Sequence, residues 1–509
     1  MKDSKLSARF WPILLILTGL AVLGEKVSRL RLYLDDNVWI FPSLLKEEFK
    51  HFAGYTYNFG LYRPLSDLTY YLFFDIYVKS PSLAHLLGLV LQIIASILVY
   101  LILKRQKADK ILAYLISLLV LFLPFAAESY MWLSGIPSLF AIILFLLQVI
   151  IVLKQDLSRK TFLLVLFIQL VAVFNYESTF FFFIPFIYLF LKKIKTTKFS
   201  KKILLVFFLI LPNFLWQVSK IIWPGHTIET RFKLIGLPLV PERIFLSLVN
   251  LFNLFFSPNI IKFYWKENFI NGLSLISPLA CVFLALAGLI IFLCLIFNKK
   301  ESFDGLEPDT PAVFWFLCFI ASLLPNILIN NTSFSFRTIY LPIICLLVFI
   351  PSFLKNISGK MPKFFSVLIK GVVSVSFLIF LILSVPGDLA IAKAYTVNWY
   401  RELSVRDQIR DEIDQIATPD NKINVYLVDY PVNLADSVKY MQGEWLLSCF
   451  NLTWCGKNMM AMVTDKIDTI ETVTGGKESL SKRQKPFVIF KYELNDDVPL
   501  LKIQFITIN

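Results

Sequence analysis

The chain of 509 residues has few charged side chains, since Asp, Glu, Lys and Arg make up 17% of it and apolar residues 57%. It contains no glycine-rich phosphate-binding loop, no zinc-ligand spacing and no nucleophile elbow, so none of the enzyme classes defined by those motifs is indicated. It does contain apolar runs of about 20 residues, such as 83–103 and 364–386, the length that crosses a bilayer. The sequence therefore predicts a polytopic helical membrane protein.

The positive charge of the chain is divided among short tracts. The net charge is +14, but the Lys and Arg residues gather between the apolar runs and form no extended basic domain with interleaved aromatic residues. A nucleic-acid-binding domain would have such a region, whereas short basic tracts mark cytoplasmic loops under the positive-inside rule. We predict no nucleic-acid partner, and contacts between the tracts and membrane lipids as a secondary effect.

The spacing of the tracts predicts about eleven transmembrane helices, with the N-terminus in the cytoplasm and an uncleaved first helix. Two short helices meeting at 175–177, rather than one long helix over 161–191, keep the lysine-rich tract 192–202 on the cytoplasmic side. We expect short interfacial helices in the two long outer loops, 25–82 and 224–270. The predicted spans are 10–24, 83–103, 111–127, 136–153, the two within 161–191, 203–223, 272–297, 312–329, 338–354 and 364–386.

A change of composition at Gly387 predicts two domains. Residues 1–386 would form the all-α transmembrane domain, and 387–509 a small extracytoplasmic α/β cap with a helix over 395–416 and strands at 424–429 and 487–492. The cysteines within apolar segments read as small core residues; they are Cys281, Cys294, Cys318 and Cys345. For Cys449 and Cys455 in the cap, a disulfide and free thiols both remain open.

Ionisable residues recur in the predicted outer segments. A carboxylate next to hydrocarbon is costly and is usually retained for a function. Asp35 and Asp36 could equally be a solvated loop entry or a helix cap, Glu128 could cap a helix end, and Arg63 and Arg337 could extend to the interface. The candidate residues are Asp35, Asp36, Arg63, Glu128, Glu177, Arg231, Lys233 and Arg337.

Five stretches together resemble the GT-C superfamily of integral-membrane glycosyltransferases, which includes protein O-mannosyltransferases, the aminoarabinose transferase of lipid A and bacterial relatives. Leu34-Asp35-Asp36 resembles the acidic pair of their first outer loop, and Tyr62-Arg63-Pro64-Leu65 the stretch that follows it. The segment 128–135 resembles their Glu, Trp and Gly pattern. Tyr176-Glu177 is similar to a Lys-Glu stretch with tyrosine in place of lysine, and 337–342 to an Arg-Tyr-Leu-Tyr-Leu-Pro signature with Thr338 and Ile339 departing from it.

The resemblance covers about residues 1–386 and implies a GT-C fold with a defined chemistry. The donor would be a sugar on a polyprenyl phosphate, and the acceptor a lipid, glycan or protein at the outer membrane face. Separately, the Lys-, Ile-, Phe- and Asn-rich composition favours a bacterial inner membrane, with the endoplasmic reticulum as the eukaryotic equivalent. Asp35 would be the general base of an inverting transfer, and Asp36 would orient it or bind the sugar or acceptor. Glu128 and Glu177 would bind sugar hydroxyls or a divalent metal, and no other cofactor is implied. The residues implied for the lipid phosphate are Arg63, Arg337, Arg231, Lys233 and Tyr340.

Three other functions remain open at this stage. A flippase or another transporter would bury charge in mid-membrane and show repeated halves, and the sequence has no internal repeat. An O-antigen-type polymerase would use arginines in a large outer loop, a place that 224–270 could fill. A scaffold of an envelope complex would tolerate Asp35→Asn without loss of function.

Overall fold

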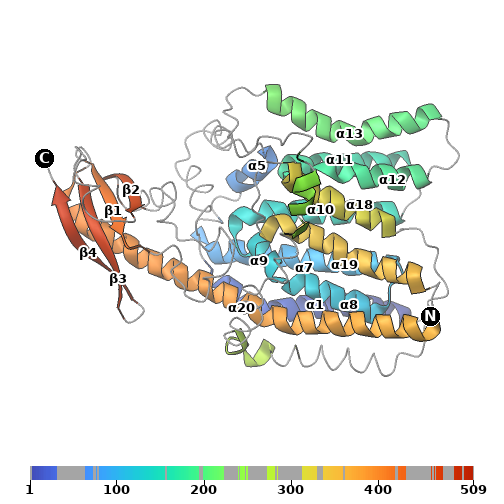
Figure 1. Ribbon diagram of the computed structural model, residues 1–509, viewed down its shortest axis with the longest axis horizontal. Coiled ribbons are helices and arrows are strands. Elements are labelled where there is room, and N and C mark those ends of the chain that lie inside the picture. The colour runs from blue at the N-terminus through green and yellow to red at the C-terminus, as the bar shows by residue number, and fades with distance from the viewer. Residues whose placement is uncertain are drawn as a thin grey trace.

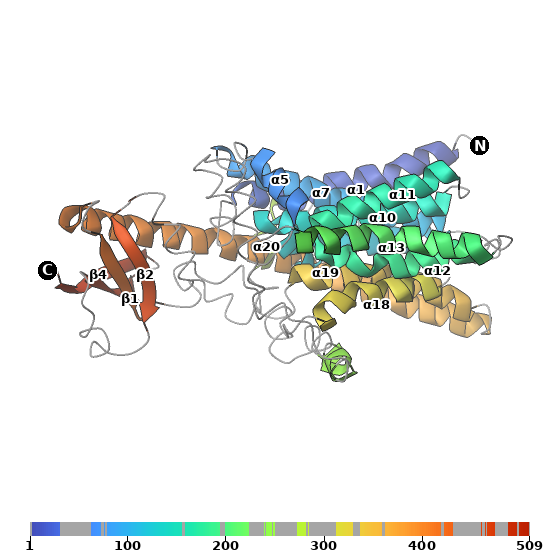
Figure 2. The same ribbon diagram turned by 90° about the horizontal axis from the view of Figure 1, so that it is seen from above.

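The computed structural model shows a bundle of helices with a small sheet beyond one end of it (Figures 1 and 2). The N-terminus lies at the opposite end of the bundle, and one helix, α20 (Lys363–Ile416), joins the bundle to the sheet. With a few single residues besides, the residues that the structure describes are 3–30, 63–72, 79–154, 158–193, 199–222, 241–246, 272–280, 312–328, 336–358, 362–418, 422–430, 466–473, 487–495 and 498–507.

The bundle has the composition of an integral membrane protein. Its principal elements are α1 (Asp3–Ser28), α5 (Pro64–Leu72), α7 (Pro81–Arg105), α8 (Lys110–Phe122), α9 (Pro124–Tyr130), η1 (Leu133–Gly135), α10 (Ile136–Lys154), α11 (Arg159–Asn175), η2 (Glu177–Phe182), α12 (Phe183–Lys193), α13 (Phe199–Ile222), α18 (Ala312–Leu328), α19 (Phe336–Ser358) and α20 (Lys363–Ile416). Among the described residues, five helices (α1, α7, α10, α13 and α20) are long and apolar enough to cross a membrane, and α8, α12, α18 and α19 are shorter apolar helices. The count of eleven is not established, because most of the predicted span 272–297 lies outside the described residues.

The predicted break within 161–191 is confirmed. Helix α11 begins where the Ser158 hydroxyl accepts a hydrogen bond from the Thr161 N–H, and it ends at Asn175. Tyr176 then takes an extended conformation, with φ −155° and ψ 130°, so the helix cannot continue through it. The chain resumes as η2 and α12, which gives two short helices with Tyr176-Glu177 at their junction.

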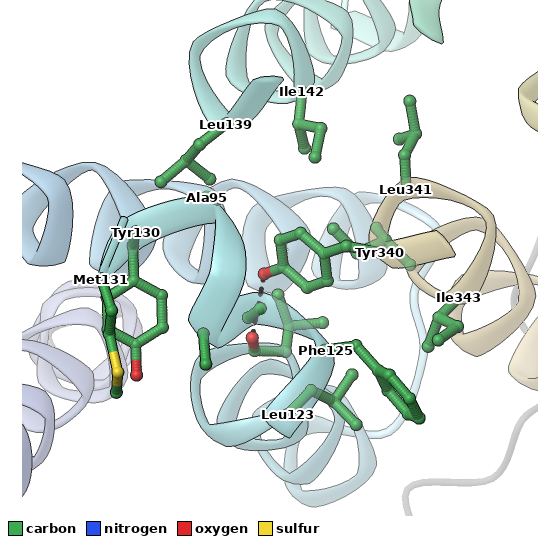
Figure 3. Packing of buried hydrophobic residues seen from close by; sticks show 14 of the residues in the cluster. Ala95, Leu123, Phe125, Tyr130, Met131, Leu139, Ile142, Tyr340, Leu341 and Ile343 are labelled. Carbon is green, nitrogen blue, oxygen red and sulfur yellow. Dashed lines mark hydrogen bonds between the residues drawn. The ribbon is translucent and has the colours of Figure 1, made fainter. Parts of the chain in front are cut away.

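The predicted single span 111–127 is wrong, because the structure divides it into α8 and α9. Pro124 begins α9 and has no N–H to donate to the carbonyl of Val120, four residues earlier. That carbonyl instead accepts hydrogen bonds from Gln92 Nε2 at 2.6 Å and from the Tyr340 hydroxyl at 2.9 Å. Figure 3 shows the Tyr340 ring among buried hydrophobic side chains, near Leu123 and Phe125. A side chain from α19 therefore stabilises the break.

A second correction concerns the end of the bundle. The two helices predicted over 364–386 and 395–416 form one continuous helix, α20, of 54 residues. Pro386 lies inside it, and the change of composition at Gly387 does not interrupt it. The backbone of Gly272 lies so close to the Pro386 carbonyl that a Cβ at 272 would overlap that oxygen, so only glycine fits there.

The C-terminal sheet has the strand order β2-β1-β3-β4, with β1 parallel to β2 and β3, and β4 antiparallel to β3. The predicted strands are confirmed as β1 (Ile423–Val428) and β3 (Phe487–Asn495), whereas β2 (Ile467–Val473) and β4 (Val498–Thr507) were not predicted. Buried Val425 and Leu427 of β1 belong to the same core as Val405 and Ile409 of α20. One face of the sheet therefore packs on the helix.

The cysteines that the structure describes agree with the sequence reading. Cys318 in α18 and Cys345 in α19 are buried free thiols, as expected of small core residues. Cys281, Cys294, Cys449 and Cys455 lie outside the described residues.

Candidate functional site

Five of the nine predicted site residues lie in described elements. Asp35, Asp36, Arg231 and Lys233 lie outside the described residues, so the predicted base and two of the predicted cations stay predictions. The other five are Arg63 beside α5, Glu128 in α9, Glu177 in η2, and Arg337 and Tyr340 in α19. For Glu177 and Arg337 the structure describes the backbone alone.

Arg63 is held against the break between α11 and η2. Its guanidinium carbon lies 4.0 Å from the centroid of the Tyr176 ring, a distance at which the cation is attracted to the face of the ring. One turn further on, the Ser66 hydroxyl donates a hydrogen bond of 2.6 Å to the Asn175 carbonyl. These contacts fix the start of α5 next to Tyr176-Glu177, although the two segments are more than 100 residues apart in sequence.

The same break is tied to the segment that follows α9. Asn175 Nδ2 donates a hydrogen bond of 2.5 Å to the carbonyl of Pro137, at the start of α10. Asn175 thus contacts α5 through its carbonyl and α10 through its side-chain amide, and it is buried. The segments around Arg63, 128–137 and 175–177 are therefore joined by hydrogen bonds, at the end of the bundle from which α20 continues (Figure 1).

Two glycines hold the backbone of α9 close to its neighbours. A Cβ at Gly88 of α7 would overlap the carbonyl oxygen of Tyr130, and a Cβ at Gly135 would overlap the carbonyl oxygen of Glu128. Glycine permits such approaches because it has no side chain. The glycine of the predicted 128–135 pattern thus has a structural role, which is to let the chain fold back over α9.

Glu128 is fully buried in α9. Its carboxyl group therefore lies inside this tightly packed turn, and a role in binding sugar or metal stays a prediction. Helix α9 packs against α7, α10, α19 and α20, and α19 begins with the segment that carries Arg337. Four of the five stretches that suggested the GT-C resemblance thus belong to packed neighbouring elements.

Tyr340 is buried, and its hydroxyl is hydrogen-bonded within the bundle. It is fully buried, donates to the Val120 carbonyl and accepts a hydrogen bond of 2.6 Å from Gln92 Nε2. These two hydrogen bonds give Tyr340 a structural role, and its contact with a lipid phosphate, like that of Arg337 three residues earlier, stays a prediction.

Sequence reasoning missed Asp388, a fully buried carboxyl group in α20. The Tyr130 hydroxyl donates a hydrogen bond of 3.3 Å to its Oδ2, which connects α9 with α20. Tyr395 and Glu402 follow at intervals of seven residues and are also fully buried, and the Tyr395 ring lies edge-on to His85 of α7 at 6.2 Å. An acid directly followed by Leu389, in the middle of a long apolar run, was the sequence signal that could have revealed this residue.

Metal binding by Glu128 and Glu177 stays a prediction. Within the described residues, no group of three or more His, Cys, Asp or Glu side chains could hold a metal ion. Asp35 and Asp36 lie outside the described residues.

Comparison with models of protein families, and with curated proteins, finds no match to this chain. The GT-C resemblance therefore rests on the motif residues and their order along the sequence.

Proposed function

We propose that this chain is a GT-C-type membrane glycosyltransferase that moves a sugar from a polyprenyl-phosphate donor to a lipid, glycan or protein acceptor. The proposed setting is a bacterial inner membrane crossed by about eleven helices, with the N-terminus in the cytoplasm and the C-terminal sheet outside. The reaction would take place at the outer face, where the lipid chain of the donor stays in hydrocarbon and its head group reaches water.

The observation that carries this proposal is the joining of separate motif segments at one end of the bundle. Arg63 lies on the ring of Tyr176, and Asn175 bonds both to Ser66 and to Pro137. Helix α9 with buried Glu128 packs against α19, which begins next to Arg337. A transferase needs such a junction because carboxyl groups must meet the sugar while guanidinium groups meet the phosphate.

The proposed chemistry is a direct displacement. Asp35 removes the proton of an acceptor hydroxyl as its oxygen bonds to the anomeric carbon, and the bond from that carbon to the phosphate oxygen breaks. The lipid phosphate leaves with the electron pair, and the configuration at the anomeric carbon is inverted. Asp36 orients the base. Arg63 and Arg337 offset the charge of the phosphate through paired N–H donors.

The contact between Arg63 and Tyr176 gives the tyrosine a defined part in this scheme. The ring lies 4.0 Å from the guanidinium carbon and would restrict the movement of the guanidinium, which can pair with two phosphate oxygens at once. Lysine would keep the charge but lose this geometry. Glu128 and Glu177 are proposed to bind sugar hydroxyls or a divalent metal.

Transfer of label from radiolabelled polyprenyl-phosphate sugars to membrane extracts tests the proposal. We expect Asp35→Asn to lower the rate by about 10²- to 10⁴-fold, and Arg63→Lys and Arg337→Ala by about 100-fold. Asp411→Asn and Arg29→Ala are matched controls, because Asp411 and Arg29 have exposed side chains in local ion pairs, and they should transfer at the wild-type rate.

The outcomes separate the rival functions. Equal labelling by the wild type and all three variants would remove Asp35, Arg63 and Arg337 from the mechanism. Absence of labelled product from every donor would favour a transporter or a scaffold. A parallel assay with a chelator decides whether a divalent metal takes part.

A further inference from the structure

Asp388 occupies a position that the proposed chemistry does not use. It lies two residues after Pro386 in the middle of α20, and none of its side chain is exposed. Among the residues that the structure describes, its Oδ2 accepts the bond from Tyr130 and its Oδ1 has no hydrogen-bond partner. Burying a carboxyl group costs free energy that ordinary packing does not return, so the hydrogen bond that Tyr130 donates to Asp388 should matter for the local structure.

The residue that donates this hydrogen bond to Asp388, Tyr130, is the last residue of α9. This helix has only seven residues, Pro124–Tyr130, too short to hold its own position. Its backbone is restrained at Tyr130 by Gly88 and at Glu128 by Gly135, through close approaches to the two carbonyl groups. The hydroxyl of Tyr130 adds a third restraint, from the side of α20. Together these contacts fix the end of α9 on which Glu128 lies, two residues before Tyr130.

Helix α20 extends this restraint to the C-terminal sheet. It is helical without interruption from Lys363 to Ile416. Twenty residues beyond Asp388, the side-chain oxygen of Gln408 accepts a hydrogen bond of 2.8 Å from the N–H of Leu501 in β4. Near the end of the helix, Lys466 forms an ion pair of 2.9 Å with Asp414. The sheet is therefore bonded to the same helix that carries Asp388.

We propose that Asp388 is a positioning residue, which holds α9, and with it Glu128, in place through the hydroxyl of Tyr130. The inference rests on the proposed function, since it assigns Asp388 to the support of the same site. Asp388 does not touch the reacting atoms, and its role needs a hydrogen-bond acceptor and not a negative charge.

A double-mutant cycle on the full chain tests this role. Asp388→Ala and Tyr130→Phe should each lower kcat by about tenfold with little change in the KM for the lipid donor, because misplacement of a bound group slows the chemical step. The double variant should lose no more than either single variant, because both changes remove one contact. Asp388→Asn keeps an acceptor oxygen and should stay within about threefold of wild type. Thr396→Val is the control, because the hydroxyl of Thr396 bonds only to its own helix, at Ala392, in the contacts described here.

Hydrogen exchange of the backbone gives a readout that does not depend on turnover. In Asp388→Ala and in Tyr130→Phe, the amides of residues 123–135 should exchange about tenfold faster than in wild type. In Asp388→Asn and Thr396→Val, they should exchange at the wild-type rate.

Three results would overturn the proposal. Losses that multiply in the double variant would show that Asp388 and Tyr130 act independently. Inactivity of Asp388→Asn equal to that of Asp388→Ala would make the charge itself essential. Unchanged exchange over 123–135 would show that Asp388 does not hold α9. A wild type without transfer from any donor would instead reject the proposed function, and the exchange measurement would still decide whether Asp388 holds α9.

Discussion

The two halves of α20 differ in which way their apolar side chains face. In the first half, the apolar side chains of Val375, Ile379 and Ile382 are more than half exposed on the surface of the protein. In the second half, Ile409 and Ile413 are fully buried and pack with the sheet, while the Arg410–Asp411 ion pair is exposed. Apolar residues thus lie outward in one half and inward in the other.

This reversal marks a change of surroundings along a single helix. An outward apolar face suits lipid, because hydrocarbon does not reward burial of that face. An inward apolar face with outward charges suits water. Asp388, Tyr395 and Glu402 lie between these two regions and are all fully buried. Their side chains therefore contact the interior of the protein and neither lipid nor water.

Truncation of a buried residue should give the largest contrast between the halves. Ile409→Ala should cost about 3 kcal/mol, because it leaves a cavity between α20 and the sheet. Val375→Ala, in the other half, should cost less than about 0.5 kcal/mol, because its side chain is exposed. The free energy of local opening, from hydrogen exchange of the β1 amides, measures the first effect, and thermal unfolding compares the two. Equal costs would contradict the reversal.

Insertion of a charge should give the inverse contrast. Val375→Lys places an ammonium group near the middle of the apolar run 364–386 and should cost about 2.5 kcal/mol of membrane insertion. Gln415→Lys, at an exposed position of the second half, should change nothing measurable. The fraction of chain that resists alkaline extraction from membranes measures insertion. A normal yield of Val375→Lys would place this face in water.

Loss of one hydrogen bond between α20 and the sheet should have the smallest effect. Gln408→Ala removes the acceptor of the Leu501 N–H and should cost about 1 kcal/mol. The amide of Leu501 would then exchange about fivefold faster. Gln415→Ala serves as its control, since Gln415 is exposed on the same helix. Identical exchange in both variants would mean that Gln408 does not anchor β4.

Local patterns were enough to predict many elements of the fold. The spans 83–103 and 136–153, the break at Tyr176 and the strands β1 and β3 follow from apolar runs, basic tracts and alternation within a few neighbouring residues. The burial of Cys318 in α18 and of Cys345 in α19 also follows from their apolar surroundings in the sequence.

The missed features depend on contacts between distant parts of the chain. Pro386-Gly387 normally ends a helix, but α20 continues through it, and the neighbouring Val385 and Leu389 are buried. At the α8–α9 break, Gln92 and Tyr340 donate hydrogen bonds to the carbonyl of Val120, and no local sequence pattern reveals these contacts. In the candidate site, the order of the motifs along the sequence predicted which segments belong to the site. The hydrogen bonds of Asn175 and the burial of Asp388 could be found only from the structure.

Because α20 is unbroken, the number of residues between two of its positions determines their distance and their relative rotation. Each residue of an α-helix advances the chain by 1.5 Å and turns it by about 100°. The twenty positions from Asp388 to Gln408 therefore set both the distance and the rotational angle between the α9 contact and the β4 contact. One residue added or removed between them would turn the sheet by more than a quarter of a circle about the helix axis, even if every side chain were kept.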